Sequence, residues 1–123
     1  MILVDSGVWI DHFRRSDNLL IERLDGGEVL SHPFITAEIV LGSLKNRQAV
    51  ARALDELPTL RLASLPEVRR LIEMHPLHGR GIGLVDASLL ACCLISPGTR
   101  LWTRDRRLHA LAIELDCAAR VSR

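Results

Sequence analysis

Three carboxylates stand alone in otherwise apolar parts of this chain. Asp5 is the one charged residue among the first ten. Glu38 is the one charge between Phe34 and Leu44, and Asp86 is the one charge between Gly81 and Thr99. A buried carboxylate is costly unless it is paired, hydrogen-bonded or bound to metal. One such residue often caps a helix, but three of the same sign indicate a shared counter-charge, most simply a hard divalent cation.

A fourth carboxylate, Asp105, repeats the pattern of Asp5. Each follows a short predicted strand, Met1–Val4 for Asp5 and Arg100–Thr103 for Asp105. In a parallel sheet both acids would emerge at the same edge, where open α/β sheets place their ligands. An Asp before a helix is also a common N-cap, which is the simpler interpretation of Asp105 taken by itself.

Four carboxylates facing one another would repel by roughly 1–4 kcal/mol per pair at ~4 Å, depending on the local dielectric. One or two Mg²⁺ or Mn²⁺ ions would remove that repulsion, polarise a phosphodiester and lower the pKa of a bound water. This is the chemistry of a nuclease or phosphatase. Ser6 and Thr103 could donate hydrogen bonds to the carboxylates from a second shell, or could simply be polar strand ends.

The basic residues are almost all arginine, with Lys45 the only lysine, and the net charge of +1 argues neither for nor against nucleic acid. Arginine favours forked contacts with phosphate. We expect contacts with a phosphate backbone from Arg80, Arg104 and Arg106, although exposed arginine is the default interpretation. A wider rim near the acids could include Arg14, Arg15, Arg100 and Arg107.

The apolar pattern predicts an α/β fold. Strands are expected at Met1–Val4, Glu28–Ser31, Leu60–Ala63, Arg100–Thr103 and, at an edge, Cys117–Val121. Helical patterns lie between them, including a largely buried helix at Phe34–Lys45 and the most apolar helix at Leu84–Ile95. Alternating strands and helices predict a mainly parallel sheet of about five strands with helices on both faces. The length suits one domain over residues 1–123.

The three cysteines show no metal-ligand spacing, and buried small side chains are their expected role. An odd count without a signal sequence predicts a reducing, cytoplasmic location. The longest charge-free run, Ala87–Thr99, is shorter than the ~20 residues of a membrane span, so we expect no membrane contact.

Four segments together resemble a known family. They are Val4-Asp5-Ser-Gly-Val-Trp-Ile-Asp11, Thr36-Ala-Glu38 with Gly42, the run from Gly79 through Asp86 to Ala91, and Leu101-Trp-Thr103-Arg-Asp105-Arg-Arg-Leu108. In this order and spacing the chain resembles the PIN-domain ribonucleases, and closely the VapC-like toxins of bacterial toxin–antitoxin pairs.

The resemblance implies a three-layer fold with a parallel five-stranded sheet. It implies that Asp5, Glu38, Asp86 and Asp105 form the acidic site of a Mg²⁺- or Mn²⁺-dependent endoribonuclease that acts on RNA. It further implies frequent homodimers and a cognate small antitoxin.

Two other interpretations remain open at this stage. A receiver-like signalling module also places acids at strand ends, but it normally needs a lysine at a later strand end, and Lys45 lies beside a helix instead. A catalytically silent protein could use the same acidic groove to grip a basic peptide.

Overall fold

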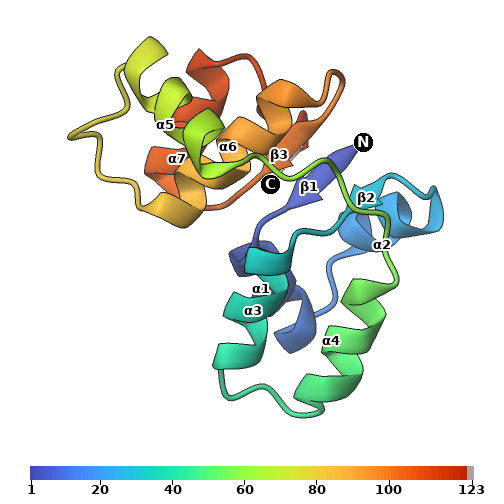
Figure 1. The fold of residues 1–123 in the computed structure, drawn as a ribbon. Helices are drawn as coiled ribbons and strands as arrows, with labels where there is room; N and C mark the ends of the chain where they lie inside the picture. Colours follow the sequence, from blue (N-terminus) through green and yellow to red (C-terminus); the bar gives the residue numbers. More distant parts are fainter. Residues whose placement is uncertain (122–123) are drawn as a thin grey trace.

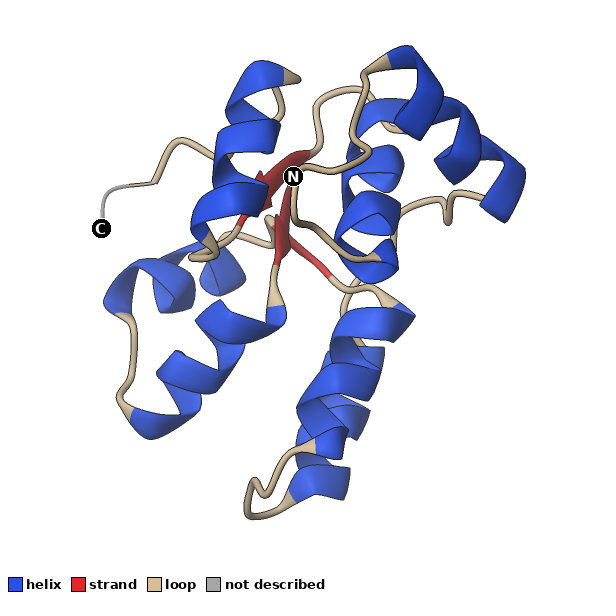
Figure 2. Cartoon of the chain, turned by 90° about the vertical axis from the view of Figure 1, so that its left-hand side faces the viewer, coloured by secondary structure: helices blue, strands red, loops and turns tan. Residues whose placement is uncertain are grey.

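A short parallel sheet lies at the centre of the chain, with helices on both sides of it (Figure 2). The computed structural model describes residues 1–121. Its central strand is β1 (Ile2–Val4), which lies between β2 (Val29–Leu30) and β3 (Arg100–Trp102). Leu3 pairs with Leu30 on one side and with Leu101 on the other. The strands are buried on both faces beyond their first residues, which is why they are apolar without alternation, apart from Arg100 at the start of β3.

The parallel α/β fold is confirmed, and the sheet is narrower than expected. The predicted strand at Leu60–Ala63 is not a strand of the sheet, and the chain just before it pairs only through the single bridge between Ser31 and Thr59. The predicted edge strand Cys117–Val121 likewise makes one bridge, between Leu101 and Ala118. Each outer segment therefore satisfies a few backbone groups of its neighbour without continuing the ladder.

Seven helices lie within residues 1–121 and form two groups (Figure 1). In one group, α1 (Ser6–Arg14) packs on α3 (Pro33–Leu41), which packs on α4 (Arg47–Asp55). In the other, α6 (Leu84–Ile95) and α7 (Arg106–Glu114) pack on β3, and α5 (Leu65–Met74) packs on α6. The remaining helix, α2 (Asn18–Asp25), precedes β2.

Side-chain caps fix where several helices begin. A capping box begins α5, since Ser64 Oγ accepts from the Glu67 N–H at 3.2 Å and Glu67 Oε1 accepts from the Ser64 N–H at 2.9 Å. Asp5 caps α1, Asp17 caps α2 and Asp105 caps α7. Two of the candidate site acids are thus held in place by the helices that they begin.

The prediction of a buried helix at Phe34–Lys45 is wrong in extent and in burial. The helix α3 ends at Leu41, because Gly42 takes an extended conformation and ends the hydrogen-bonding pattern. Leu41 is 85% exposed and Phe34 is 43% exposed, whereas Ile35 and Ile39 face the core. The helix lies at the surface of the fold with one face inward, so its apolar sequence is not a sign of complete burial.

The three cysteines are buried and free, as the sequence predicted. Among the described residues, no helix is both long enough and apolar enough to cross a membrane.

Candidate active site

The carboxylate of Asp5 lies at the carboxyl end of the central strand and is buried, with 9% of the residue exposed. Its Oδ1 accepts from the Ser6 N–H at 2.8 Å, and its Oδ2 accepts from the Thr103 hydroxyl at 2.7 Å. The backbone N–H of Asp5 donates to the carbonyl of Trp102 on β3. These contacts fix the orientation of the carboxylate, because both of its oxygens are held from separate elements.

Thr103 connects two of the candidate acids. Its hydroxyl donates to Asp5 and accepts from the backbone N–H of Asp105 at 3.1 Å. Asp105 Oδ1 accepts from the Leu108 N–H at 2.9 Å, so this residue is an N-cap, as the simpler interpretation of its position predicted. Capping occupies one carboxylate oxygen, and the charge of Asp105 still acts on its neighbours.

Asp86 is the acid most affected by its surroundings. It lies in the first turn of α6, half-buried. Burial and the negative charges of Asp5, Asp105 and Glu38 raise the pKa of Asp86 to about 6, and a hydrogen bond from the Gly83 backbone opposes this only in part. The three other candidate acids are therefore all close enough to Asp86 to repel its charge.

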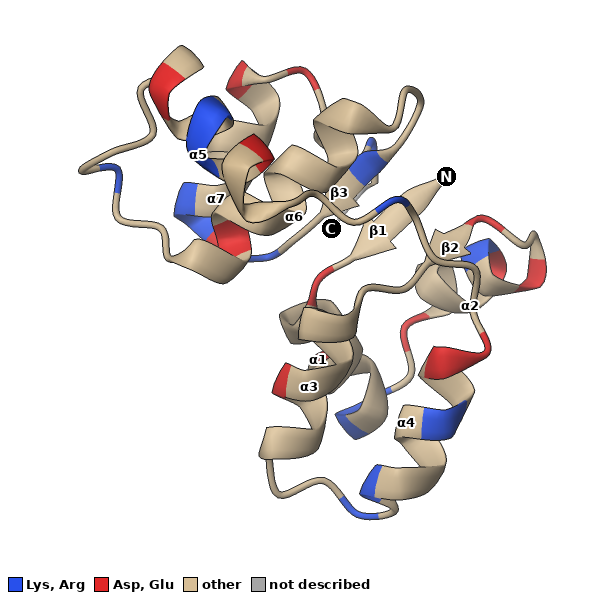
Figure 3. Ribbon diagram, in the orientation of Figure 1, with Lys and Arg blue, Asp and Glu red and all other residues tan. Residues whose placement is uncertain are grey.

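Glu38 approaches the same place from α3. Partial burial raises the pKa of Glu38, a hydrogen bond from the Ser6 side chain lowers it, and the charge of Asp5 raises it again. Four acids from four separate places in the sequence thus lie near enough, at the carboxyl edge of the sheet, for their charges to act on Asp86 or on one another. Figure 3 shows acidic positions at the start of α1, on α3, and at the facing ends of α6 and α7.

No basic side chain neutralises this group within residues 1–121, where every ion pair lies elsewhere. Within the described residues, no three of the acids lie close enough together to coordinate a metal ion as they stand. The donor set itself suits a hard cation, because it consists of carboxylate oxygens with an unmet demand for positive charge. Glu38 is exposed, so its side chain has the freedom to turn toward such an ion, whereas Asp105 is exposed but held by its helix cap.

Comparison with known proteins gives a consistent result. The PIN domain family matches residues 2–114 of the chain. This chain belongs to the PIN domain family. It is 45% identical over 114 residues to "Ribonuclease VapC32" of Mycobacterium tuberculosis, in both strain CDC 1551 / Oshkosh and strain ATCC 25618 / H37Rv. Each alignment covers 93% of this chain and 92% of the relative.

The arginines predicted to contact RNA have different surroundings in this PIN domain. Arg104 is held by two acids, with its guanidinium 2.6 Å from Asp11 Oδ2 and 2.7 Å from Asp17 Oδ2. Arg80 is paired with Glu114 Oε1 at 2.7 Å. Arg106 is exposed at the first position of α7 and has no ion pair among the described residues. Of the three, Arg106 is the one whose charge is not already matched by an acid.

The sequence analysis missed the roles of Asp11 and Asp17, because both lie in polar stretches that suggest simple solvation. Asp17 caps α2 and is held by Arg104, so the hydrogen bonds from Leu20 and Arg104 outweigh its partial burial and lower its pKa. The Arg104 guanidinium also lies 6.0 Å from the centre of the Trp102 ring. A signal was available, since an Asp three residues before the helical Leu20 is a typical N-cap.

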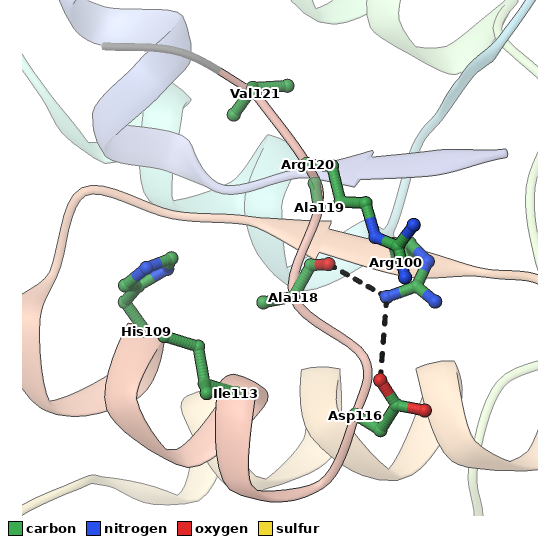
Figure 4. A pocket seen from close by; sticks show the side chains of 8 residues that line it. All are labelled: Arg100, His109, Ile113, Asp116, Ala118, Ala119, Arg120 and Val121. Atoms are coloured by element: carbon green, nitrogen blue, oxygen red, sulfur yellow. Dashed lines mark hydrogen bonds and ion pairs between the residues drawn. The ribbon is translucent and has the colours of Figure 1, made fainter.

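A separate cavity of about 420 Å³ lies at the other end of β3 (Figure 4). There Arg100 donates to the Ala118 carbonyl at 3.0 Å and lies 4.0 Å from Asp116 Oδ1. Arg100 begins β3, whereas the candidate acids follow the ends of strands or lie on helices beyond them. Arg100 therefore does not belong to the arginine rim that the sequence suggested near the acids. None of the four acids lines this cavity.

Proposed function

We propose that this chain is a Mg²⁺- or Mn²⁺-dependent endoribonuclease that acts as the toxin of a toxin–antitoxin pair. The observation that carries the proposal is the environment of Asp86, where burial and the charges of Asp5, Asp105 and Glu38 raise its pKa to about 6. Membership of the PIN domain family and similarity to a protein named ribonuclease support the same activity. A receiver-like module fits less well, since Lys45, the only lysine, lies in the turn between α3 and α4.

In this proposal Asp5, Glu38 and Asp86 hold the cation, and Asp105 completes the site directly or through water. The bound cation would supply charge neutralisation of the phosphodiester and a lowered pKa for the attacking water. Thr103 keeps the Asp5 carboxylate oriented, since it donates to the oxygen that the helix cap leaves free. Arg106 lies next to Asp105 and could contact the RNA backbone.

The activity is tested by replacing Asp5 with Asn, Glu38 with Gln and Asp86 with Asn, one at a time. We expect each nearly isosteric change to abolish RNA cleavage, because a neutral amide is a poor ligand for a hard cation. The control is Glu73→Gln on α5, which removes an exposed carboxylate outside the group. Folding of each variant is verified by its melting temperature, and a fully active Asp86→Asn variant would refute the assignment.

The cognate antitoxin would satisfy the same demand for positive charge. A basic side chain of the partner, most effectively the fork of an arginine, would approach Asp5, Glu38, Asp86 or Asp105 and exclude RNA or metal. An apolar cavity of about 200 Å³, lined in part by Trp9, could seat hydrophobic residues of the partner. Its lining also includes Phe13, Leu24, Val50, Ala53, Leu54 and Leu57.

The inhibition is tested with two forms of the partner, in which its basic residue is replaced by Glu or by Ala. Glu should weaken inhibition more than Ala, since it brings a like charge to the acids. The rate of RNA cleavage at rising partner concentration measures this. Equal inhibition by the original partner and both variants would mean that the acids are not blocked directly.

We further propose that the chain forms homodimers and acts in the cytoplasm. Exposed apolar side chains on α5 and α6, including Leu65, Met74 and Leu94, support a self-association surface. Replacing Met74 with Asp should shift sedimentation toward the monomer, while an unchanged profile would place the interface elsewhere. Free, buried cysteines suit a reducing compartment.

A further inference from the structure

A cavity of about 440 Å³ lies between the C-terminal half of α1 and the turn that joins α3 to α4. It is lined by Ile10, Phe13, Arg14, Ile39, Gly42, Ser43, Leu44 and Lys45. This volume lies in the range of small-molecule pockets and is large enough for one nucleotide. It shares no lining residue with the acidic group, so it is a second place where a ligand could bind.

The floor of this cavity is apolar. Phe13 is half-buried and stacks on Trp9, with ring centres 5.9 Å apart and an angle of 23° between the rings. Ile10 and Ile39 approach from α1 and α3, and Leu44 approaches from the turn. An aromatic ring held in this way and bordered by aliphatic side chains suits the flat face of an unpaired base.

The rim of the cavity is positively charged. Arg14 and Lys45 are exposed there, and neither has an ion pair among residues 1–121, in contrast to Arg80 and Arg104. The sequence from Ile39 to Leu54 contains three basic residues and no acidic one. Figure 3 shows basic positions at the end of α1, in the α3–α4 turn and along α4. This rim therefore favours the binding of an anion such as a phosphate.

The cavity lies next to the acidic group along the same pair of helices. Asp5 begins α1, and Glu38 lies near the end of α3, which packs on α1. From Glu38 to Gly42 the chain advances four residues, or about 6 Å at the rise of a helix. A strand of RNA held by the acids could reach the cavity within about one or two nucleotides.

We propose that this cavity binds one nucleotide of the RNA, close to the bond that is cut. Its base packs on Phe13 and the aliphatic side chains, and its phosphate contacts Arg14 and Lys45. The proposal rests on the proposed ribonuclease function and adds to it a binding place for one unpaired base of the RNA.

Binding is tested first, with the full chain carrying Asp86→Asn to prevent cleavage. The probe is a fluorescent single-stranded RNA of roughly 12 nucleotides, within the span of single-strand binding sites. Arg14→Ala with Lys45→Ala should weaken binding at least about tenfold and reduce the slope of log affinity against log salt by about 1.4, the value for two phosphate contacts. The matched control is Arg69→Ala with Arg70→Ala, which removes the same charge at exposed positions of α5 outside the cavity. Equal losses in the two double variants would overturn the proposal.

Base binding is tested in the active chain by removing one base at a time from an RNA that it cleaves. We expect kcat/KM to fall about tenfold when the missing base lies within two nucleotides of the cut, the scale of one lost stacking contact. With Leu44→Ala, which opens the cavity, the same base should matter much less, since the two changes remove one shared contact. Full additivity of the two changes would refute the cavity as the binding site.

The two tests separate this proposal from the proposed function. A chain that cleaves RNA with added Mn²⁺ and tolerates Arg14→Ala with Lys45→Ala without loss would refute only the cavity. A chain that cleaves no RNA, and whose melting temperature does not respond to Mn²⁺, would refute the ribonuclease itself.

Discussion

Replacing Asp86 with Asn should stabilise the metal-free protein at neutral pH while it abolishes activity. Burial and the charges of Asp5, Asp105 and Glu38 raise the pKa of Asp86 from 3.8 to about 6. The ionised form is therefore disfavoured in the folded state, and folding carries that cost whenever Asp86 is charged. Asn keeps the shape of the side chain without the charge.

The size of the effect follows from that shift. A rise of roughly two pKa units corresponds to about 3 kcal/mol in a fully buried site. Because Asp86 is partly exposed, solvent screening reduces this to about 1–1.5 kcal/mol. For a chain of this length we expect a rise in melting temperature of roughly 4–6 °C.

The pH dependence identifies the cause. Between the unfolded pKa near 3.8 and the folded pKa of about 6, the folded protein binds more protons than the unfolded one. The stability of the original protein should therefore fall as pH rises through that window, and Asp86→Asn should not show this component. The advantage of Asn should be complete above about pH 6 and absent below about pH 4.

The assay is thermal unfolding with chelator present, from pH 4 to pH 8, beside Glu73→Gln as a control for net charge. The control lies on an exposed part of α5 and should change the melting temperature little at any pH. Two results would contradict this account of the acidic group. One is an Asp86→Asn variant that is less stable than the original at pH 7, and the other is a variant whose gain in stability is the same at every pH.

Three further outcomes are expected. Mn²⁺ or Mg²⁺ should raise the melting temperature of the original protein more than that of Asp86→Asn, and chelator should stop cleavage. Cleavage that persists after exhaustive chelation would exclude a metal-dependent reaction. Thr103→Val should lower the free energy of unfolding by about 1–3 kcal/mol and reduce cleavage, because a buried oxygen of Asp5 loses its hydrogen-bond donor. A variant as stable and as active as the original would contradict this. Arg104→Ala should lower the free energy of unfolding by about 1 kcal/mol, because it breaks two partly exposed ion pairs, and Arg104→Lys should recover part of this loss. Denaturant unfolding measures both variants, and an unchanged midpoint for Arg104→Ala would contradict the prediction.

The sequence by itself was sufficient for the fold class, and it singled out the four acids as candidates for the site. Asp5, Glu38 and Asp86 are isolated charges in apolar segments, and isolation of that kind is visible without coordinates because burying a charge is costly. The alternation of strands and helices likewise predicts a parallel sheet. What these patterns could not give is the width of the sheet. The predicted strand Leu60–Ala63 lies beside a single bridge at Thr59, and the predicted strand Cys117–Val121 contains a single bridge at Ala118.

Only the tertiary structure decided which charged groups are matched by a partner. Arg104, Asp11 and Asp17 come from three segments that periodicity does not relate, and their ion pairs depend on where the loop after β3 meets α1 and α2. The exposure of α3 was also decided only by the tertiary structure, because an apolar sequence does not show which side of the helix faces a neighbouring element. The cavity beside Phe13 and Lys45 also arises only when α1 packs against α3, since a hollow is a property of the space between elements.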